Sequence, residues 1–157
     1  MQKYIIIIAI TLVAIVLVIV VSQFFIPGVD ATAYAIEYSK VFGSYDIDKV
    51  DEYLNELTVI TYRGTSKTYK ELRTNIISAF NEKKFIMTND SSYGSGKGGF
   101  VDGVQTVRMQ SYVDLDGKSI EVYIEMQLEK TGLSSAKIKS LSSDNEFFGY
   151  LFFGKTE

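Results

Sequence analysis

The hydrophobic pattern divides the chain near residue 30 into two parts of different character. From Ile5 to Val21 all seventeen residues are uncharged, and fourteen of them are Ile, Leu or Val. Beyond residue 30, apolar positions recur at the spacings of amphipathic helices and half-buried strands. The pattern predicts one continuous apolar segment followed by a folded part. One domain is expected in that part, because a chain of 157 residues suffices for a single well-packed core.

The apolar segment predicts a transmembrane helix over residues 4–26. A lone strand in hydrocarbon leaves its N–H and C=O groups unpaired, whereas a helix pairs them internally. A helix of 22 residues ending at Ile26 is about 33 Å long, close to the roughly 30 Å apolar core of a bilayer. Tyr4 and Phe25 lie where interfacial aromatic residues occur, and Pro27 stops the helix.

The charges that flank this helix predict its orientation. Lys3 precedes it and Asp30 follows it, so the N-terminus is expected in the cytosol and the C-terminal domain on the far side of the cell membrane. The predicted division is a cytosolic tail over 1–3, the transmembrane helix over 4–26, a linker over 27–31 and an extracytoplasmic α+β domain over 32–154. The alternative for 4–26 is a signal peptide, uncleaved or cleaved at Ala31-Thr32-Ala33, but the apolar run exceeds the roughly 7–15 residues of a signal core.

Three amphipathic helices are predicted in the domain. The first has apolar residues at helical spacing over 34–45 and stops near Gly43. The second covers 46–57, with Asp46 as its N-cap. The third begins at a capping box formed by Thr68 and Glu71. Its predicted buried stripe comprises Tyr69, Leu72, Ile76, Ala79 and Phe80.

Strands are predicted over 58–64, 84–90, 104–113, 119–129, 136–143 and 147–153. The dipeptide Asp116-Gly117 favours a two-residue hairpin turn between the third and fourth of them. If Leu115 opposes Lys118, one surface of this hairpin is apolar and the other is polar. The apolar pairs are then Val113–Ile120, Met109–Ile124 and Val107–Met126, and the polar pairs are Arg108–Glu125, Tyr112–Glu121 and Gln110–Tyr123.

The order of these elements resembles a known family. Two short helices, a strand ending in Tyr-Arg-Gly, a capped third helix and then hairpins are similar to the nuclear transport factor 2-like superfamily, which shares its cone with cystatin-like domains. The resemblance covers residues 31–154 and implies an α+β fold in which a curved antiparallel sheet packs on three helices. It rests on element order, so it implies a fold rather than an activity.

Composition excludes several classes of function. The chain has no Cys and no His, which removes thiol nucleophiles, Cys/His zinc sites and imidazole acid–base chemistry. The net charge of −3 provides no basic surface for nucleic acid. Gly94, Gly96 and Gly99 have the spacing of a dinucleotide fingerprint, but a strand rather than a helix is predicted after them, so a loop between strands is expected there. We therefore predict no enzyme activity, no catalytic residues, no metal and no cofactor.

The expected function is a non-catalytic, membrane-anchored module of the bacterial cell envelope that contacts the bilayer through 4–26 and binds a protein partner. Its plan is similar to that of the inner-membrane scaffolds of secretion and conjugation systems, although its predicted cytosolic tail is shorter. The apolar run near the C-terminus offers a partner surface comprising Phe147, Phe148, Tyr150 and Phe152. The alternative is a small hydrophobic ligand in the cone, with a cavity lined by Tyr34, Tyr38, Phe85, Met109 and Met126.

Overall fold

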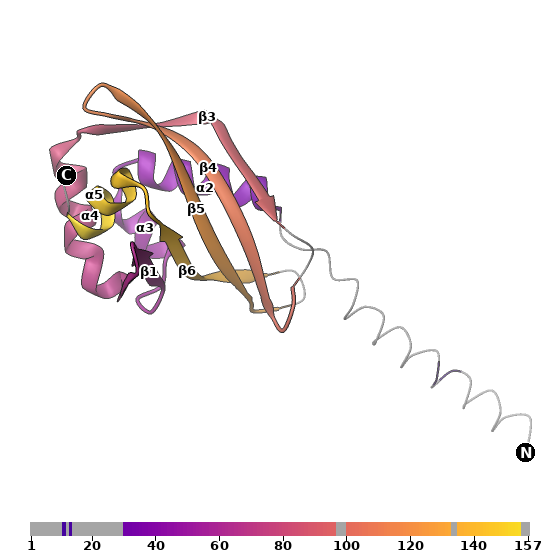
Figure 1. Cartoon of the computed structure of the whole chain (residues 1–157). Helices are drawn as coiled ribbons and strands as arrows, with labels where there is room; N and C mark the ends of the chain where they lie inside the picture. The colour runs from indigo at the N-terminus through magenta and orange to yellow at the C-terminus, as the bar shows by residue number, and fades with distance from the viewer. Residues whose placement is uncertain (1–10, 12, 14–29, 97–99, 133–134, 155–157) are drawn as a thin grey trace, which may run out of the picture.

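The computed structural model describes residues 11, 13, 30–96, 100–132 and 135–154. These residues form four helices and a six-stranded sheet (Figure 1). The helices are α2 (Ala31–Gly43), α3 (Ile47–Tyr53), α4 (Tyr69–Glu82) and α5 (Glu146–Phe153). The strands are β1 (Val59–Tyr62), β2 (Thr65–Thr68), β3 (Phe85–Gly96), β4 (Val104–Leu115), β5 (Lys118–Lys130) and β6 (Ala136–Ser143).

The predicted tail over 1–3 and, apart from Thr11 and Val13, the predicted transmembrane helix over 4–26 lie outside the described residues. Within the described part of the chain, no helix combines the length and the apolar character needed to cross a membrane. The linker predicted over 27–31 is too long at its C-terminal end, because α2 already begins at Ala31. Asp30 caps this helix by accepting hydrogen bonds from the N–H groups of Thr32 and Ala33, at 2.9 and 3.3 Å.

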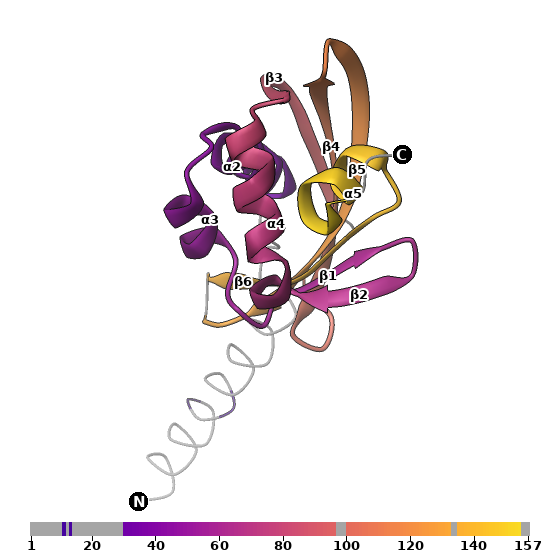
Figure 2. The same ribbon diagram turned by 90° about the vertical axis from the view of Figure 1, so that its left-hand side faces the viewer.

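The strands form one sheet in the order β2-β1-β6-β5-β4-β3. Every neighbouring pair is antiparallel except β1 and β6, which run parallel and make the sheet mixed rather than purely antiparallel. The helices lie on one face of the twisted sheet (Figure 2). The opposite face of β4 and β5 is open to solvent and carries alternating polar side chains.

The predicted hairpin register is confirmed at all of its positions. Leu115 pairs with Lys118, and the whole ladder from Val104–Glu129 to the turn keeps this register. Asp116 and Gly117 both have positive φ, at 52° and 80°, as a type I′ turn requires. Val107, Val113, Val122 and Met126 are fully buried against the helices, so the apolar surface of the hairpin forms one wall of the core.

The predicted buried stripe of the third helix is also confirmed, since all five of its residues are buried in α4. The capping box forms as predicted, with Thr68 N–H donating to the Glu71 carboxylate at 2.8 Å. Aromatic rings fill the space between α4, α5 and the sheet. Phe85 lies at the centre of this cluster, with ring centroids 5.0 Å from Phe147, 4.9 Å from Tyr45 and 6.2 Å from Phe80.

The strand predicted over 147–153 is wrong, because these residues form helix α5 and are the fourth helix of the domain. Asn145 caps it by accepting a hydrogen bond from Phe147 N–H at 2.8 Å, and Gly154 ends it with φ of 63°. The run is apolar on both faces because the helix is surrounded by α4, β1 and β5. The whole run from Phe147 to Phe152 is buried.

One predicted loop needs correction, and the structure adds one strand. Gly94 and Gly96 do not belong to a loop, because β3 resumes pairing with β4 at Tyr93 after an irregularity that follows Thr88. Gly99 lies outside the described residues. Strand β2 was not predicted; it forms because Arg63 and Gly64, with φ of 47° and 77°, turn the chain back along β1.

Candidate functional site

A surface cleft of about 440 Å³ opens between the first turns of α2, the end of α3 and the start of β6. We call it the α2–β6 cleft. Its lining comprises Ala33, Tyr34, Glu37, Glu52, Tyr53, Ala136, Lys137 and Ile138. The helical period places Tyr34 and Glu37 on one face of α2, so one turn of that helix supplies both an aromatic and an acidic group.

Two tyrosines hold the elements of the cleft together. The Tyr34 hydroxyl donates to the carbonyl of Ala136 at 3.4 Å, and the Tyr53 hydroxyl donates to the carbonyl of Tyr34 at 3.4 Å. Burial raises the pKa of Tyr34, and burial, with smaller contributions from nearby tyrosines and Glu37, raises the pKa of Tyr53 well above its usual value. Both phenols therefore stay protonated and act as neutral donors in the cleft.

The charge at the rim of the cleft is negative. Glu37 and Glu52 are exposed, and neither forms an ion pair with a Lys or Arg within the part of the chain that the structure describes. Lys137 is the basic residue of the lining, but its ammonium group pairs with Glu129 at 3.2 Å. The cleft thus combines aromatic surface with uncompensated carboxylates, which suits a cationic group.

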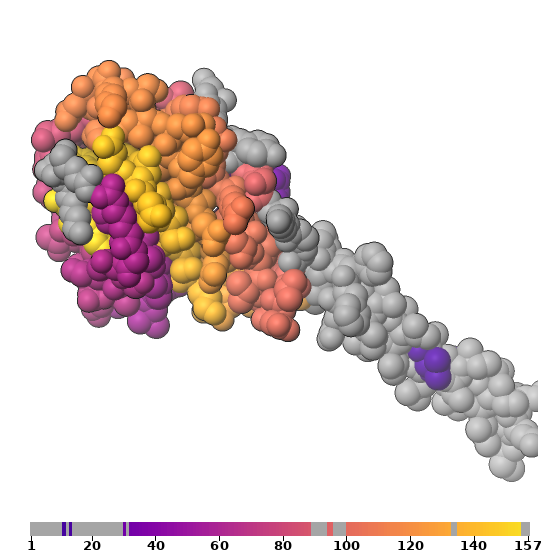
Figure 3. Space-filling view, viewed as in Figure 1, coloured from indigo at the N-terminus to yellow at the C-terminus, as the bar shows by residue number. Residues whose placement is uncertain are grey.

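Four of the five residues predicted to line a cone cavity lie in the packed core. Tyr34 lines the α2–β6 cleft, whereas Tyr38, Phe85, Met109 and Met126 are each at most 2% exposed. Met109 also contributes to a cleft of about 310 Å³ on the outer face of the sheet, beside Arg108 and Tyr123. Figure 3 shows this outer face, where β4 and β5 (salmon to orange) form a broad surface that the C-terminal part of the chain (yellow) separates from β1 and β2 (magenta).

The hydroxyl group of Tyr38 is unusual among the buried polar groups. Other buried hydroxyls have partners: Ser39 and Ser111 share a hydrogen bond at 3.0 Å between α2 and β4, and Thr58 donates to the carbonyl of Ile138 at 3.1 Å. Tyr38 is fully buried, burial strongly raises its pKa, and its hydroxyl oxygen has no hydrogen-bond partner among the residues that the structure describes. A buried polar atom of this kind costs about 1–3 kcal/mol.

The residues predicted as an exposed partner surface are all in the core. Phe147, Phe148 and Phe152 are fully buried and Tyr150 is 5% exposed. Phe148 and Phe152 stack on each other at 4.6 Å, and Phe152 also contacts Phe42 at 5.5 Å. The physical reason is the helical conformation of α5, which turns every side of the run toward another element.

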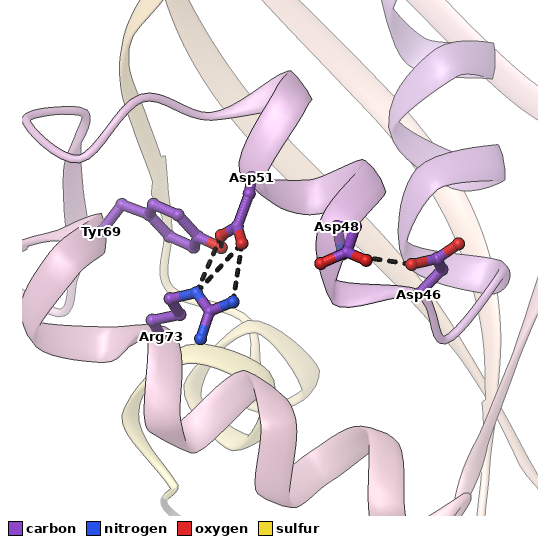
Figure 4. A network of polar contacts seen from close by, with 5 residues as sticks. All are labelled: Asp46, Asp48, Asp51, Tyr69 and Arg73. Atoms are coloured by element: carbon purple, nitrogen blue, oxygen red, sulfur yellow. Dashed lines mark hydrogen bonds and ion pairs between the residues drawn. The ribbon is translucent and has the colours of Figure 1, made fainter.

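A polar cluster on the other side of α3 is saturated by its own hydrogen bonds (Figure 4). Arg73 donates to Asp51 through Nε at 2.9 Å and Nη2 at 2.6 Å, and the Tyr69 hydroxyl donates to the same carboxylate. The hydrogen bond from Arg73 holds the pKa of Asp51 below its usual value, while burial and Asp51 raise the pKa of Tyr69. This cluster fastens α3 to α4 and lines a cleft of about 580 Å³.

Sequence reasoning missed Glu37, Glu52 and Tyr53 as site residues. Their acidic and aromatic character is visible in the sequence, but nothing there shows that α3 and the start of β6 meet beside α2. A metal site would require a cluster of side chains able to bind the ion. The described residues contain no group of three or more His, Cys, Asp or Glu side chains arranged to hold a metal ion.

Comparison with known proteins finds likeness in structure alone. No protein-family model matches the chain, and no curated protein matches it. A domain of unknown function with a cystatin-like fold from Nostoc punctiforme PCC 73102 has a TM-score of 0.54 and 16% identity, over 72% of this chain and 73% of that one. An NTF-2 like protein of unknown function from Shewanella oneidensis MR-1 has a TM-score of 0.52 and 11% identity, over 73% of this chain and 93% of that one. The domain therefore has the nuclear transport factor 2-like, or cystatin-like, fold.

Proposed function

We propose that the chain is a non-catalytic, membrane-anchored extracytoplasmic module that binds a protein partner through the α2–β6 cleft. The observation that carries this proposal is the unpaired acidic rim of an open aromatic cleft.

The cleft favours a basic side chain of the partner. A Lys or Arg side chain places its apolar stem along aromatic and aliphatic surface while its charged head stays near solvent. Here Tyr34, Tyr53 and Ala136 offer the surface, and Glu37 and Glu52 offer the countercharge. An aromatic face beside a carboxylate adds a cation–π contribution of about 0.5–1 kcal/mol at an exposed site.

The anchor is the predicted helix over 4–26, inserted with the N-terminus in the cytosol. Because α2 starts at Ala31, only residues 27–30 separate that helix from the domain. The cleft includes Ala33, Tyr34 and Glu37 from the first turns of α2, so the proposed docking site lies close to the bilayer. A partner anchored in the same membrane, as in an envelope scaffold, is well placed to reach it.

The test is site-specific photocrosslinking with the full chain in its native membrane. A photoreactive phenylalanine analogue in place of Tyr34 is expected to give adducts with a discrete protein. Replacing both Glu37 and Glu52 by Gln is expected to lower the adduct yield about fivefold to tenfold, because two exposed charge pairs together are worth on the order of 1 kcal/mol. The yield is measured as the ratio of crosslinked to free chain.

The matched controls lie on the outer face of the sheet. The same analogue in place of Tyr123, which is 57% exposed, should give few adducts. The double change Glu121→Gln and Glu125→Gln removes the same amount of charge on the outer face. It should leave unchanged the adduct yield of the analogue placed at position 34. Equal adduct yields with and without Glu37 and Glu52 would contradict docking at the cleft.

A second candidate function, binding of a small hydrophobic molecule, is favoured by the unpartnered hydroxyl of Tyr38. A carbonyl or hydroxyl group of a ligand that reached it would complete its hydrogen bonding. The burial of the Tyr38 hydroxyl predicts a specific effect on the free energy of unfolding. In the free protein, Tyr38→Phe is expected to raise the free energy of unfolding by about 1 kcal/mol, because it removes a buried polar atom without a partner.

Urea unfolding of the full chain in detergent micelles, followed by circular dichroism, measures this effect. Tyr112→Phe is the control, since its hydroxyl lies on the outer face and donates to Glu121 at 3.0 Å. A Tyr38→Phe variant that is less stable than the parent chain would show that the hydroxyl is already satisfied, as by a molecule retained through purification.

A further inference from the structure

The β3–β4 hairpin extends beyond the point at which the chain enters the domain. Helix α2 runs antiparallel to β3, because Tyr45 just after α2 packs on Phe85 at the start of β3, and Thr32 at its beginning donates to the carbonyl of Gly94 at 3.2 Å. Gly94 pairs with Met109, and β4 continues five residues further to Val104. That is about 17 Å of strand beyond the start of α2.

The turn at this end, residues 100–103, is held rigidly. We call it the basal turn. Val101 and Val104 exchange two backbone hydrogen bonds of 2.9 Å, and Asp102 and Gly103 have φ of 50° and 77°, as in a type I′ turn. Lys130 N–H also donates to the carbonyl of Gly103 at 2.8 Å, which fixes the turn to β5.

Apolar side chains are displayed at this rigid turn. Val101 is 73% exposed, although its backbone is fully hydrogen-bonded, and Phe100 beside it is only partly buried against the core. Both views place the start of β4 at the same end of the domain as the start of α2 (Figures 1 and 2). The hydrogen-bonded turn therefore holds Val101 exposed to solvent at the end of the domain where α2 begins.

We infer that the basal turn rests on the bilayer surface, with Val101 in the interfacial layer. This inference depends on the proposed anchor over 4–26. From Ile26 to Asp30 there are four residue steps, which span at most about 15 Å when fully extended. The hairpin extends about 17 Å past the start of α2, so a domain tethered this closely brings the basal turn to the headgroup layer.

The charges near the turn indicate which property of the lipid matters. The described ionisable side chains beside the turn are Asp102, on the turn, and Lys130, whose backbone binds the turn. Glu129, which pairs with Val104, adds a negative charge that Lys137 compensates in an ion pair of 3.2 Å, so the two signs balance. The contact therefore relies on apolar insertion rather than on attraction to anionic headgroups. Zwitterionic phosphatidylcholine is a sufficient partner, and the contact should be insensitive to salt.

The chain contains no Trp, so one introduced Trp reports its own surroundings. The full chain with Val101→Trp is reconstituted into phosphatidylcholine vesicles whose acyl chains do or do not carry bromine, a contact quencher. Ile86→Trp is the matched control: Ile86 is also β-branched, is 67% exposed and pairs with Asp114, ten residues along β4 from Val104. This places it about 33 Å further from the base.

Brominated lipid is expected to lower the emission of the Val101→Trp chain by about half, with a blue-shifted maximum, because a Trp at the interface contacts the upper acyl chains. The Ile86→Trp chain should lose no emission. Flotation of the vesicles is read in parallel. A chain that floats with its vesicles but is not quenched at position 101 overturns the contact while leaving the anchor intact.

Two other outcomes also overturn the inference. A chain that does not float removes the anchor and the contact with it. A blue-shifted but unquenched Trp at position 101 shows that protein, such as a second copy of the chain, covers the turn in place of lipid.

Discussion

Replacing Phe147 by Ala is expected to lower the free energy of unfolding by about 3–5 kcal/mol. The Phe147 ring is fully buried and meets Phe85 edge to face, with centroids 5.0 Å apart. Phe85 in turn contacts Tyr45 and Phe80, so the ring joins α5 to the centre of the aromatic cluster. Its removal leaves a cavity that these rigid neighbours cannot close. Urea unfolding of the full chain in detergent micelles measures the loss.

Tyr123→Ala is the control for this experiment, because Tyr123 is a large aromatic residue that is 57% exposed on the outer face. Its effect should stay within about 0.5 kcal/mol. The comparison separates two roles for Phe147. A partner-surface residue would lose binding at unchanged stability, so a loss of less than about 1 kcal/mol at Phe147 would contradict its place in the core.

The β4–β5 hairpin was predictable because its information is local. Apolar and polar residues alternate with a period of two, and the dipeptide Asp116-Gly117 fixes the register to a single choice. A slip by one residue would turn Val107 and Val113 to solvent. The same locality explains the success at α4, where a capping box and a stripe at helical spacing lie within fifteen residues.

Helix α5 was not predictable from periodicity, because a helix buried on all sides has none. Its aromatic residues favour strand in general, so the composition of the run predicts a strand. The chain does hold opposing signals in Asn145, Glu146 and Gly154, which serve as N-cap, first-turn acid and C-terminal glycine. These capping positions, rather than the apolar run between them, specify the helix.

The candidate site could be predicted only in part, because it is assembled from distant segments. The sequence predicts Tyr34 near the mouth of the cone, but Glu52 and Lys137 reach the α2–β6 cleft through α3 and β6. Strand β6 lies in the middle of the sheet because it pairs in parallel with β1, some eighty residues earlier in the chain. Such a pairing leaves no local pattern in the sequence.

Gly149→Ala is expected to destabilise the domain by about 2 kcal/mol, the second largest effect. A Cβ atom at this buried position of α5 would lie 2.5 Å from Cζ and 2.9 Å from Cε1 of Tyr62. Carbon atoms pack at about 3.5–4.0 Å, so the ring must move by about 1 Å. Tyr62 is 2% exposed and its ring packs on Phe153, so this movement strains the core.

Two opposing terms set the size of this effect. Alanine is better than glycine within a helix by about 1 kcal/mol, whereas overpacking a core costs about 1–3 kcal/mol and here lies at the upper end. In a Tyr62→Leu background the contact is gone, so Gly149→Ala should become neutral or slightly stabilising. In a Tyr62→Phe background Cζ remains 2.5 Å away, so the full penalty should persist. Urea unfolding of this double-mutant cycle measures a coupling of about 2–3 kcal/mol, and equal penalties in the Leu and Phe backgrounds would show that α5 does not approach β1 this closely.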